Sequence, residues 1–295
     1  MSVFTGSAVA IVTPFHNDAD QTVNYDAFAE LLDFQIENGT DAIVVCGSTG
    51  ESATMSEEEH LELCRFAVDY VKHRVPVIAG TGSNCTKTAA NLTEAVRGYG
   101  ADAALVITPY YNKGTQEGLY QHFRAVAEAG RGIPVLMYNV PSRTGVNMTA
   151  ETSLKLSAVR NITSIKEASG NVAQIIDIKR DAPEGFTVLS GDDDQTLPLM
   201  ASGADGVISV ASNIAPAKLK AMISAIGRCD LREAIELNNQ LYPLFHACFV
   251  ECNPIPVKAA LSILGLCEAE MRLPLTEATE STRALMKEVL KHIDL

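Results

Sequence analysis

The sequence lacks the features that mark exported, membrane-spanning and nucleic-acid-binding proteins. No lysine or arginine precedes Arg65, so the basic first segment of a signal peptide is missing, and no apolar run approaches the length of a membrane span. The 295 residues carry a formal net charge of −13 with no compensating run of basic residues, which would repel a polyanion. We therefore expect a cytoplasmic protein that binds neither nucleic acid nor membrane.

Cysteine is present, but its spacing indicates neither a metal site nor a disulfide framework. The seven cysteines are odd in number and contain no CxxC pair, which suits reduced thiols in a reducing compartment. Cys248 and Cys252 could share one helix face, but no histidine or second cysteine pair accompanies them to complete a site. The sequence thus predicts no structural zinc and no other bound metal.

Eight short apolar segments rich in β-branched residues recur along the chain, and helical patterns fill the gaps between them. Such nearly continuous apolar strands, separated by helices, are typical of a parallel sheet covered on both faces. Eight units predict a closed α/β barrel, the (β/α)8 or TIM barrel. A doubly wound sheet is the alternative, but GxGxxG is absent after the first strand and eight units exceed its usual count. The predicted strands span residues 8–13, 42–46, 75–79, 103–108, 134–138, 162–166, 187–189 and 206–210.

Beyond the eighth predicted strand the pattern becomes helical. Only the first of the helices there is needed to complete the barrel. We therefore expect a catalytic barrel over residues 1–229 and a C-terminal helical appendage over residues 230–295. The helices predicted in this part of the chain span residues 216–226, 232–250, 255–264 and 277–292.

Lys166 is the first candidate for chemistry, because the active sites of such barrels lie at the carboxyl ends of the strands. Partial desolvation at the end of the sixth strand would favour the neutral amine, a nucleophile toward carbonyl groups. An α-keto acid would form an iminium there, and its charge would acidify the neighbouring methyl group. A strand-end lysine alone is a weak signal, since most lysines are exposed to solvent. Tyr138 ends the adjacent strand and could reach a substrate on Lys166, although an isolated tyrosine there is more often a core residue.

Two further segments could bind carboxylates at the same end of the barrel. The segment 47–51, Gly-Ser-Thr-Gly-Glu, combines two hydroxyls with glycines that let backbone amides approach a ligand. Generic glycine turns look similar, and a phosphate site is the rival, but the three aspartates after the seventh strand would repel a phosphate. Arg143 stands in a proline-stiffened turn, where its guanidinium could grip a second carboxylate or simply lie on the surface.

Taken together, these motifs resemble the dihydrodipicolinate synthase family of pyruvate-dependent Schiff-base aldolases. The resemblance runs from residue 4 to residue 274 through GSTGES, VIAGTGSN, VITPYYN, YNVPSRTG, IKEASGN, LSGDD, GVISV and NPIPVK. It implies that pyruvate condenses with L-aspartate 4-semialdehyde at the entry to the diaminopimelate and lysine branch. It also implies no cofactor beyond a covalent pyruvate Schiff base on Lys166, and a homo-oligomer, usually a tetramer built as a dimer of dimers.

The resemblance assigns roles residue by residue through matching motifs. Lys166 would form the Schiff base and Tyr138 would transfer protons, in a relay with Ser48 and with a Tyr111 contributed across a subunit interface. The implied substrate-binding positions are Thr49 for the pyruvate carboxylate, Arg143 for the aldehyde's carboxylate, and Gly191 and Ile208 as pocket lining.

Two departures from the family pattern bear on specificity and regulation. At the position of Ser48 the synthases commonly have threonine, and the related N-acetylneuraminate lyases commonly have serine. A sugar-acid lyase therefore stays an alternative function, and a catalytically inactive binding barrel is a second one. YNVPSRTG favours the synthase, because the lyases lack this arginine. Glu57 and Thr88 depart from the pattern of lysine-inhibited members, so we expect weak or absent feedback inhibition. The positions that match the lysine-effector pocket are Ser52, Ala53, His60, Asn84 and Tyr110.

Overall fold

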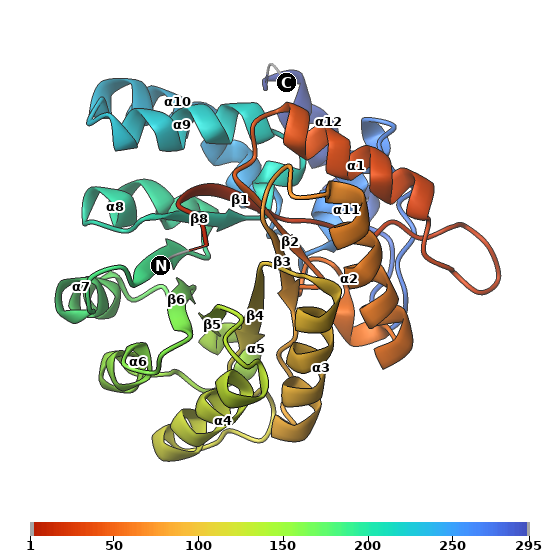
Figure 1. Ribbon diagram of the computed structural model, residues 1–295. Helices are drawn as coiled ribbons and strands as arrows, with labels where there is room; N and C mark the ends of the chain where they lie inside the picture. The colour runs from red at the N-terminus through yellow and green to blue at the C-terminus, as the bar shows by residue number, and fades with distance from the viewer. Residues whose placement is uncertain (1–2, 294–295) are drawn as a thin grey trace.

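Eight parallel strands close into a barrel in the computed structural model, which describes residues 3–293 (Figure 1). Each strand pairs with the next along the chain, and the eighth pairs with the first, so the predicted (β/α)8 fold is confirmed. The strands are β1 (Gly6–Ala10), β2 (Ala42–Val45), β3 (Val77–Gly80), β4 (Ala103–Ile107), β5 (Val135–Asn139), β6 (Ile162–Glu167), β7 (Thr187–Ser190) and β8 (Gly206–Ser209).

All eight predicted strands are present, and the differences lie at their ends. The largest concerns the first strand, which was predicted over residues 8–13 but ends at Ala10. The reason is a long-range contact: the Val12 amide donates a hydrogen bond to Asn213 Oδ1 at 3.1 Å, so a side chain replaces the neighbouring strand as its partner. The sequence pattern is local, whereas this hydrogen bond joins residues 201 positions apart, so the end of the strand could not be predicted from the pattern.

Alternating residues of the strands face two different cores. On β2, Ala42 and Val44 belong to the cluster inside the barrel, whereas Ile43 and Val45 pack outward against the helices. Since both faces are buried, a strand needs apolar residues at every position, which explains the continuous apolar runs in the sequence. At the closing seam Gly206 pairs with Gly6, and a Cβ on Gly206 would lie 2.1 Å from the Gly6 carbonyl oxygen.

Helices follow the strands and surround the barrel, as Figure 1 shows. Ser56 illustrates how one of them begins: its side chain accepts a hydrogen bond from the Glu59 amide, and three glutamates occupy the first turn of α2, where they complement the helix dipole. The helices of the barrel are α1 (Tyr25–Glu37), α2 (Glu57–Val71), α3 (Thr86–Tyr99), α4 (Gln116–Ala129), α5 (Pro141–Thr144), α6 (Ala150–Ser157), α7 (Val172–Asp181), α8 (Thr196–Ala201) and α9 (Pro216–Gly227).

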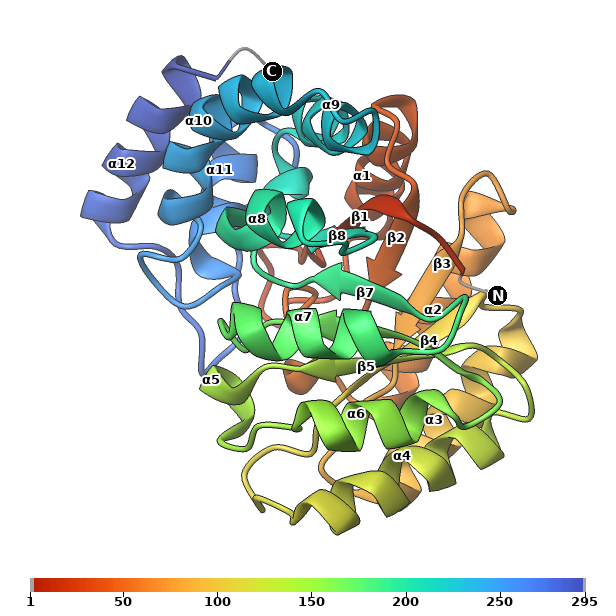
Figure 2. The same ribbon diagram turned by 90° about the vertical axis from the view of Figure 1, so that its left-hand side faces the viewer.

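Three more helices form the C-terminal part of the described chain and lie together at one side of the barrel (Figure 2). They are α10 (Leu231–Ala247), α11 (Ile255–Ile263) and α12 (Glu280–Lys291), and each overlaps a helix predicted from the sequence. The boundary predicted between residues 229 and 230 falls in the turn from α9 to α10. This region is tied to the barrel by charge, because Lys258 of α11 pairs with the Glu51 carboxylate at 2.5 Å and both side chains are buried.

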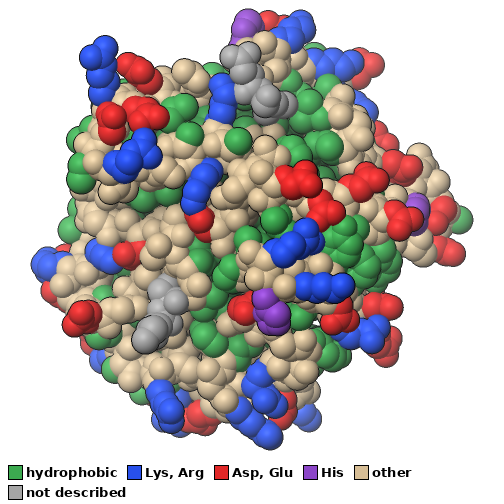
Figure 3. Space-filling model, turned by 45° about the horizontal axis from the view of Figure 1, so that its top comes forward, with side chains coloured by type: hydrophobic (Ala, Val, Ile, Leu, Met, Phe, Trp, Pro, Cys, Tyr) green, Lys and Arg blue, Asp and Glu red, His purple; other side chains and the backbone are tan. Residues whose placement is uncertain are grey.

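The surface carries both signs of charge side by side. On the face shown in Figure 3, lysine and arginine side chains are interspersed with aspartate and glutamate, in keeping with the many ion pairs between exposed side chains. Within residues 3–293, no helix combines the length and the apolar character that crossing a membrane would require.

Candidate active site

Lys166 lies at the carboxyl end of β6, directly opposite Tyr138 of β5 in the strand register. Its side chain is almost fully enclosed, since only 5% of the residue is exposed. The Nζ atom sits over the Tyr138 ring, 4.4 Å from the ring centroid. The structure therefore brings together the amine and the phenol that the sequence placed on neighbouring strand ends, and shields the amine from bulk solvent.

Burial changes the protonation of this lysine. Desolvation lowers the pKa of Lys166 to about 8, with a smaller contribution from Arg143, while the Asp192 and Asp193 carboxylates oppose the shift. About half of the amines are then neutral at pH 8, whereas an ordinary lysine is almost entirely charged there. A neutral amine is the form that attacks a carbonyl group.

Tyr138 shows the opposite response to the same surroundings. Burial raises the pKa of Tyr138, because the ionised phenolate would lose its hydration, and the nearby Arg143 guanidinium only partly offsets this. The side chain therefore remains a phenol at neutral pH. A phenol can both donate and accept a hydrogen bond, which is what a group that passes protons to and from a bound substrate requires.

A cavity of about 490 Å³ lies over Lys166 and Tyr138. Its wall combines two parts of the chain that are far apart in sequence: the ends of several strands and the segment 249–253 that follows α10. The polar and charged residues of the wall are Ser48, Thr49, Tyr138, Ser142, Arg143, Lys166, Asp192, Glu251, Cys252 and Asn253. The cavity thus gathers amine, hydroxyl, guanidinium and carboxylate groups around one small space.

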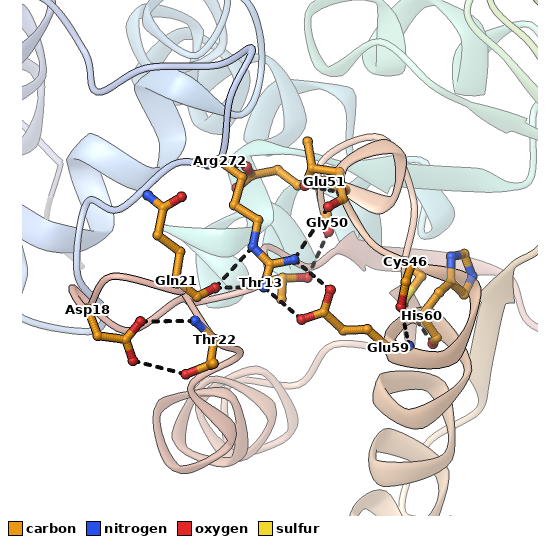
Figure 4. A network of polar contacts seen from close by, with 12 residues as sticks. Thr13, Asp18, Gln21, Thr22, Cys46, Gly50, Glu51, Glu59, His60 and Arg272 are labelled. Atoms are coloured by element: carbon orange, nitrogen blue, oxygen red, sulfur yellow. Dashed lines mark hydrogen bonds and ion pairs between the residues drawn. The ribbon is translucent and has the colours of Figure 1, made fainter.

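The loop after β2 is held in place on three sides. Asn253 Nδ2 donates a hydrogen bond to Thr49 Oγ1 at 2.9 Å. Thr13 Oγ1 donates to the Gly50 carbonyl oxygen at 2.8 Å, as Figure 4 shows. Glu51 has a left-handed backbone conformation and anchors the loop to Lys258. Ser48 and Thr49 are therefore fixed at the cavity wall, where a small carboxylate could accept hydrogen bonds from them.

Arg143 reaches the same cavity from α5, the single turn that follows β5. Its Nη2 atom donates a hydrogen bond to the Asn253 carbonyl oxygen at 3.1 Å. The guanidinium has five N–H donors, so most of them remain for a ligand carboxylate. Arg143 lines the cavity and is nevertheless exposed to solvent, which places a cation at the rim rather than the floor of the site.

Asp192 adds a carboxyl group to which the sequence reasoning gave no role in binding or catalysis. Burial raises the pKa of Asp192 to about 6, and the nearby Lys166 partly opposes the shift. Its neighbour Asp193 is buried and accepts hydrogen bonds from the amides of Val210 and Ala211 at 3.1 and 2.9 Å. Asp192 and Asp193 therefore lie near Lys166, where their carboxylates favour the positively charged form of its amine.

Tyr111 is not part of the cavity within one chain. Its side chain is 88% exposed, its backbone is left-handed with φ of 72°, and it is not among the residues that line the wall. Of the expected relay, one chain therefore assembles Ser48 and Tyr138 around Lys166 but leaves Tyr111 facing outward.

Gly191 and Ile208 occupy different positions relative to the substrate space. Gly191 lines the cavity, and a Cβ there would lie 3.0 Å from Lys166 Cε and 2.8 Å from Ala168 Cβ. Ile208 does not line the cavity; it is fully buried in the inner barrel cluster together with Leu189 and Tyr138. Gly191 thus leaves room for the lysine, whereas Ile208 belongs to the apolar interior of the barrel.

A second cavity of about 520 Å³ adjoins the first and shares Ser48, Arg143, Cys252 and Asn253 with it. Four of the five residues expected in an effector pocket line it, and so do Glu57 and Thr88. Asn84 is the exception: it is not part of the wall, and its carbonyl oxygen accepts a hydrogen bond from Asn112 Nδ2 at 3.0 Å. The residues in the wall are Ser52, Ala53, His60 and Tyr110.

Asn253 lines the cavity and is the main site residue that the sequence reasoning missed; Glu167, next to Lys166 in the chain, is buried but does not line the cavity. Asn253 lies in the NPIPVK motif, and it contacts Thr49 and Arg143 across 204 and 110 positions. Glu167 follows Lys166 and accepts hydrogen bonds from the Asn139 amide and the Ser169 hydroxyl. Because burial raises the pKa of Glu167 to about 7, this carboxyl is partly protonated near neutrality. The sequence motifs mark these residues as candidates, but they do not predict which residues contact one another in the fold.

A (β/α)8 barrel with a buried, partly neutral lysine at the end of β6 belongs to the class of barrels that is equipped to form a Schiff base with a carbonyl substrate. Residues 3–293 match the Dihydrodipicolinate synthetase family over almost the whole chain, and the protein belongs to that family. The resemblance noted in the sequence motifs is thereby confirmed.

Individual relatives agree with this assignment. The chain is 50% identical to the 4-hydroxy-tetrahydrodipicolinate synthase of Syntrophus aciditrophicus, with 99% of both chains covered. The crystal structure of dihydrodipicolinate synthase from Aquifex aeolicus is 49% identical, covers 98% of this chain and 97% of its own, and superposes with a TM-score of 0.95. The Acinetobacter baumannii enzyme, crystallised with pyruvate, is 43% identical with a TM-score of 0.95 over 99% of both chains.

Proposed function

We propose that the protein is a 4-hydroxy-tetrahydrodipicolinate synthase, a lyase that condenses pyruvate with L-aspartate 4-semialdehyde. The observation that carries this proposal is the enclosed Lys166 amine, with its pKa lowered to about 8, beside Tyr138 in a cavity that also presents Arg143. Membership of the family and the names of relatives at about half identity over the full chain support the same reaction.

The reaction begins when the neutral Lys166 amine attacks the keto carbon of pyruvate. Loss of water forms an iminium, which draws electrons from the adjacent methyl group so that a proton leaves and an enamine forms. The enamine carbon then attacks the aldehyde of the second substrate and forms the new carbon–carbon bond. Finally the substrate's own amine attacks the iminium carbon, which closes the ring and releases Lys166.

The residues of the wall divide the remaining work between them. Tyr138 moves protons at the keto carbon and at the methyl group, since it stays a phenol at neutral pH. Ser48 belongs to the same proton relay, Thr49 holds the pyruvate carboxylate, and Arg143 holds the carboxylate of the aldehyde. Asp192 and Asp193 stabilise the positive charge of the iminium, because both carboxylates already favour a charged Lys166.

The proposal includes an assembly in which Tyr111 completes a neighbouring subunit's site. Tyr111 is 88% exposed and does not line the cavity over Lys166, and the neighbouring Tyr110 is 37% exposed, so the loop after β4 presents aromatic surface to solvent. A homotetramer built as a dimer of dimers would bury this surface. Each subunit would then supply its Tyr111 to the proton relay of a neighbouring subunit. We also place the reaction in the cytoplasm without any cofactor, in keeping with seven unpaired cysteines.

A sugar-acid lyase of the same architecture is the competing function, and Arg143 argues against it. A guanidinium at the rim suits a short substrate that ends in a carboxylate, whereas a long polyhydroxylated chain offers hydroxyls there. The test is an initial-rate assay that offers pyruvate with L-aspartate semialdehyde in one arm and N-acetylneuraminate in the other. We expect consumption only in the first arm, with none by Lys166→Ala. Consumption of N-acetylneuraminate alone would overturn the proposal.

We further propose that L-lysine inhibits this enzyme weakly or not at all. Thr88 lines the second cavity where inhibited relatives carry a glutamate that pairs with the α-amino group of lysine. A neutral hydroxyl cannot replace that charged partner. Initial rates measured against added lysine should stay close to the uninhibited value at submillimolar concentrations, and half-inhibition in that range would contradict the expectation.

A further inference from the structure

Three potential metal ligands meet in the protein interior outside the proposed active site. Cys46 follows β2, and His60 and Cys64 lie four residues apart on one face of α2. All three residues are buried, and their ligand atoms lie within 4.8 Å of one another. The sequence predicted no metal because no histidine accompanies its closely spaced cysteines; here the fold brings Cys46 to His60, which lies 14 residues further along the chain.

The imidazole of His60 is oriented as a metal ligand usually is. Its Nε2 atom lies 2.7 Å from the Gly80 carbonyl oxygen, and since a carbonyl can only accept, the proton of a neutral ring sits on Nε2. The lone pair is then on Nδ1. A ligating histidine that donates its other N–H to a backbone carbonyl is the common arrangement around protein-bound metals.

Gly80 also fixes the position of Cys46. A Cβ on Gly80 would lie 2.2 Å from the Cys46 carbonyl oxygen, so only glycine allows β3 to approach this turn so closely. Cys46 itself has a left-handed backbone conformation, and its Sγ contacts the His60 carbonyl oxygen at 3.7 Å. Figure 4 shows Cys46 and His60 side by side at the start of α2. Backbone packing thus fixes where Cys46 stands relative to His60.

Charge balance selects the kind of ion. Two thiolates and a neutral imidazole carry a charge of about −2, so a divalent ion gives a neutral site, whereas a monovalent soft ion would leave a net negative charge in an apolar core. Thiolate and imidazole ligands favour zinc among the common divalent ions. Atoms bound to one tetrahedral zinc lie roughly 3.5–3.8 Å apart, which a contraction of about 1 Å would achieve here.

We propose that Cys46, Cys64 and His60 Nδ1 form a binding site for a divalent zinc ion. A water molecule would complete the tetrahedral set, and His60 lines the cavity of about 520 Å³ that would supply it. The ion would join the end of β2 to α2, immediately before the loop that carries Ser48 and Thr49. Its role is therefore to stabilise the support of that loop.

The test measures zinc binding directly and independently of enzyme activity. The full-length protein is stripped with a chelator, and Zn²⁺ alone is added back with competition by a chromophoric chelator. We expect one zinc per chain and a zinc-dependent rise in the midpoint of thermal unfolding. Cys64→Val and Cys46→Val should weaken binding by roughly tenfold or more. Cys248→Val is the matched control, because Cys248 is equally buried but lies outside the cluster, and it should bind zinc like the parent protein.

Co²⁺ provides a second measurement that does not depend on the variants folding. Cobalt bound by two thiolates gives an intense thiolate-to-metal absorption, which we expect in the parent protein and in Cys248→Val. Binding of zinc that is unchanged in Cys64→Val, or cobalt bound without this absorption, would overturn the proposal. So would a stripped parent protein that takes up no zinc.

Discussion

Among residues 3–293 two lysines are buried, and the comparison between them shows what makes one of them reactive. Lys166 Nζ lies 4.4 Å from the centroid of the Tyr138 ring, and Lys258 Nζ lies 4.2 Å from that of Phe15. Burial lowers the pKa of both amines. Their environments are thus alike in desolvation and in aromatic contact.

The difference between the two lysines is the carboxylate partner. Lys258 pairs with Glu51 at 2.5 Å and donates to the Glu270 carbonyl oxygen at 2.8 Å, so its positive charge is matched at short range. No ion pair within 4.0 Å involves Lys166 in the described chain, and Asp192 and Asp193 act on it only from further away. A buried amine without a paired carboxylate, such as Lys166, is free to react with a substrate. A buried amine that is paired with a carboxylate, such as Lys258, instead holds two parts of the fold together.

The largest expected effect comes from removing the reactive lysine. Lys166→Ala should reduce turnover by at least about a thousandfold, because no other amine can form the imine. Its midpoint of thermal unfolding should stay near that of the parent protein, since an unpaired buried amine contributes little to stability. Steady-state kinetics and thermal unfolding together check this. Substantial residual turnover would assign the chemistry to another residue.

Replacing Lys258, the paired lysine, should chiefly reduce the stability of the fold. Lys258→Met would leave the buried Glu51 carboxylate without its partner and cost about 3–5 kcal/mol in the free energy of unfolding. Adding Glu51→Gln to that variant should restore part of the loss. The exposed Lys287→Met is the matched control and should change stability by at most about 0.5 kcal/mol. Equal destabilisation by Lys166→Met would erase the distinction between the two lysines.

The smallest expected effect concerns the space around Lys166. Gly191→Ala would place a methyl group 3.0 Å from Lys166 Cε and displace the amine, so we expect kcat/KM to fall by up to about a hundredfold. Gly227→Ala is the control, because a Cβ there meets nothing within 4 Å. Kinetics of the two variants provide the measurement. Parent-like activity of Gly191→Ala would show that the position of the amine tolerates crowding.

The sequence predicted the framework because the framework depends on local patterns. Continuous apolar strands and amphipathic helices can be recognised from neighbouring residues, and the barrel then places Tyr138 and Lys166 together. Contacts that join distant segments could not be predicted in this way. The bonds of Asn253 to Thr49 and Arg143, the pairing of Lys258 with Glu51, and the meeting of Cys46 with α2 each depend on how complete elements pack.

The same limit applies to exposure. The sequence placed Lys166 at a partly desolvated mouth, but the residue is only 5% exposed, and the distant segment 249–253 forms part of the wall of its cavity. For Tyr111 the family resemblance implied a role across a subunit interface, and its 88% exposure in one chain is compatible with that expectation. Burial is a property of the assembled fold, and pKa values that depend on it follow only from the structure.

The central claim is that Lys166 is a partly neutral amine that captures a keto acid, and pH-dependent trapping tests it most directly. The protein is mixed with pyruvate, reduced with borohydride at a series of pH values, and mapped by peptide mass spectrometry. We predict a reduced pyruvate adduct on the Lys166 peptide and none on the Lys258 peptide, with trapping that rises with pH around a midpoint of about 8, because deprotonation produces the nucleophile. An unmodified Lys166 peptide, or a midpoint at the ordinary lysine value of 10.5, would contradict the account.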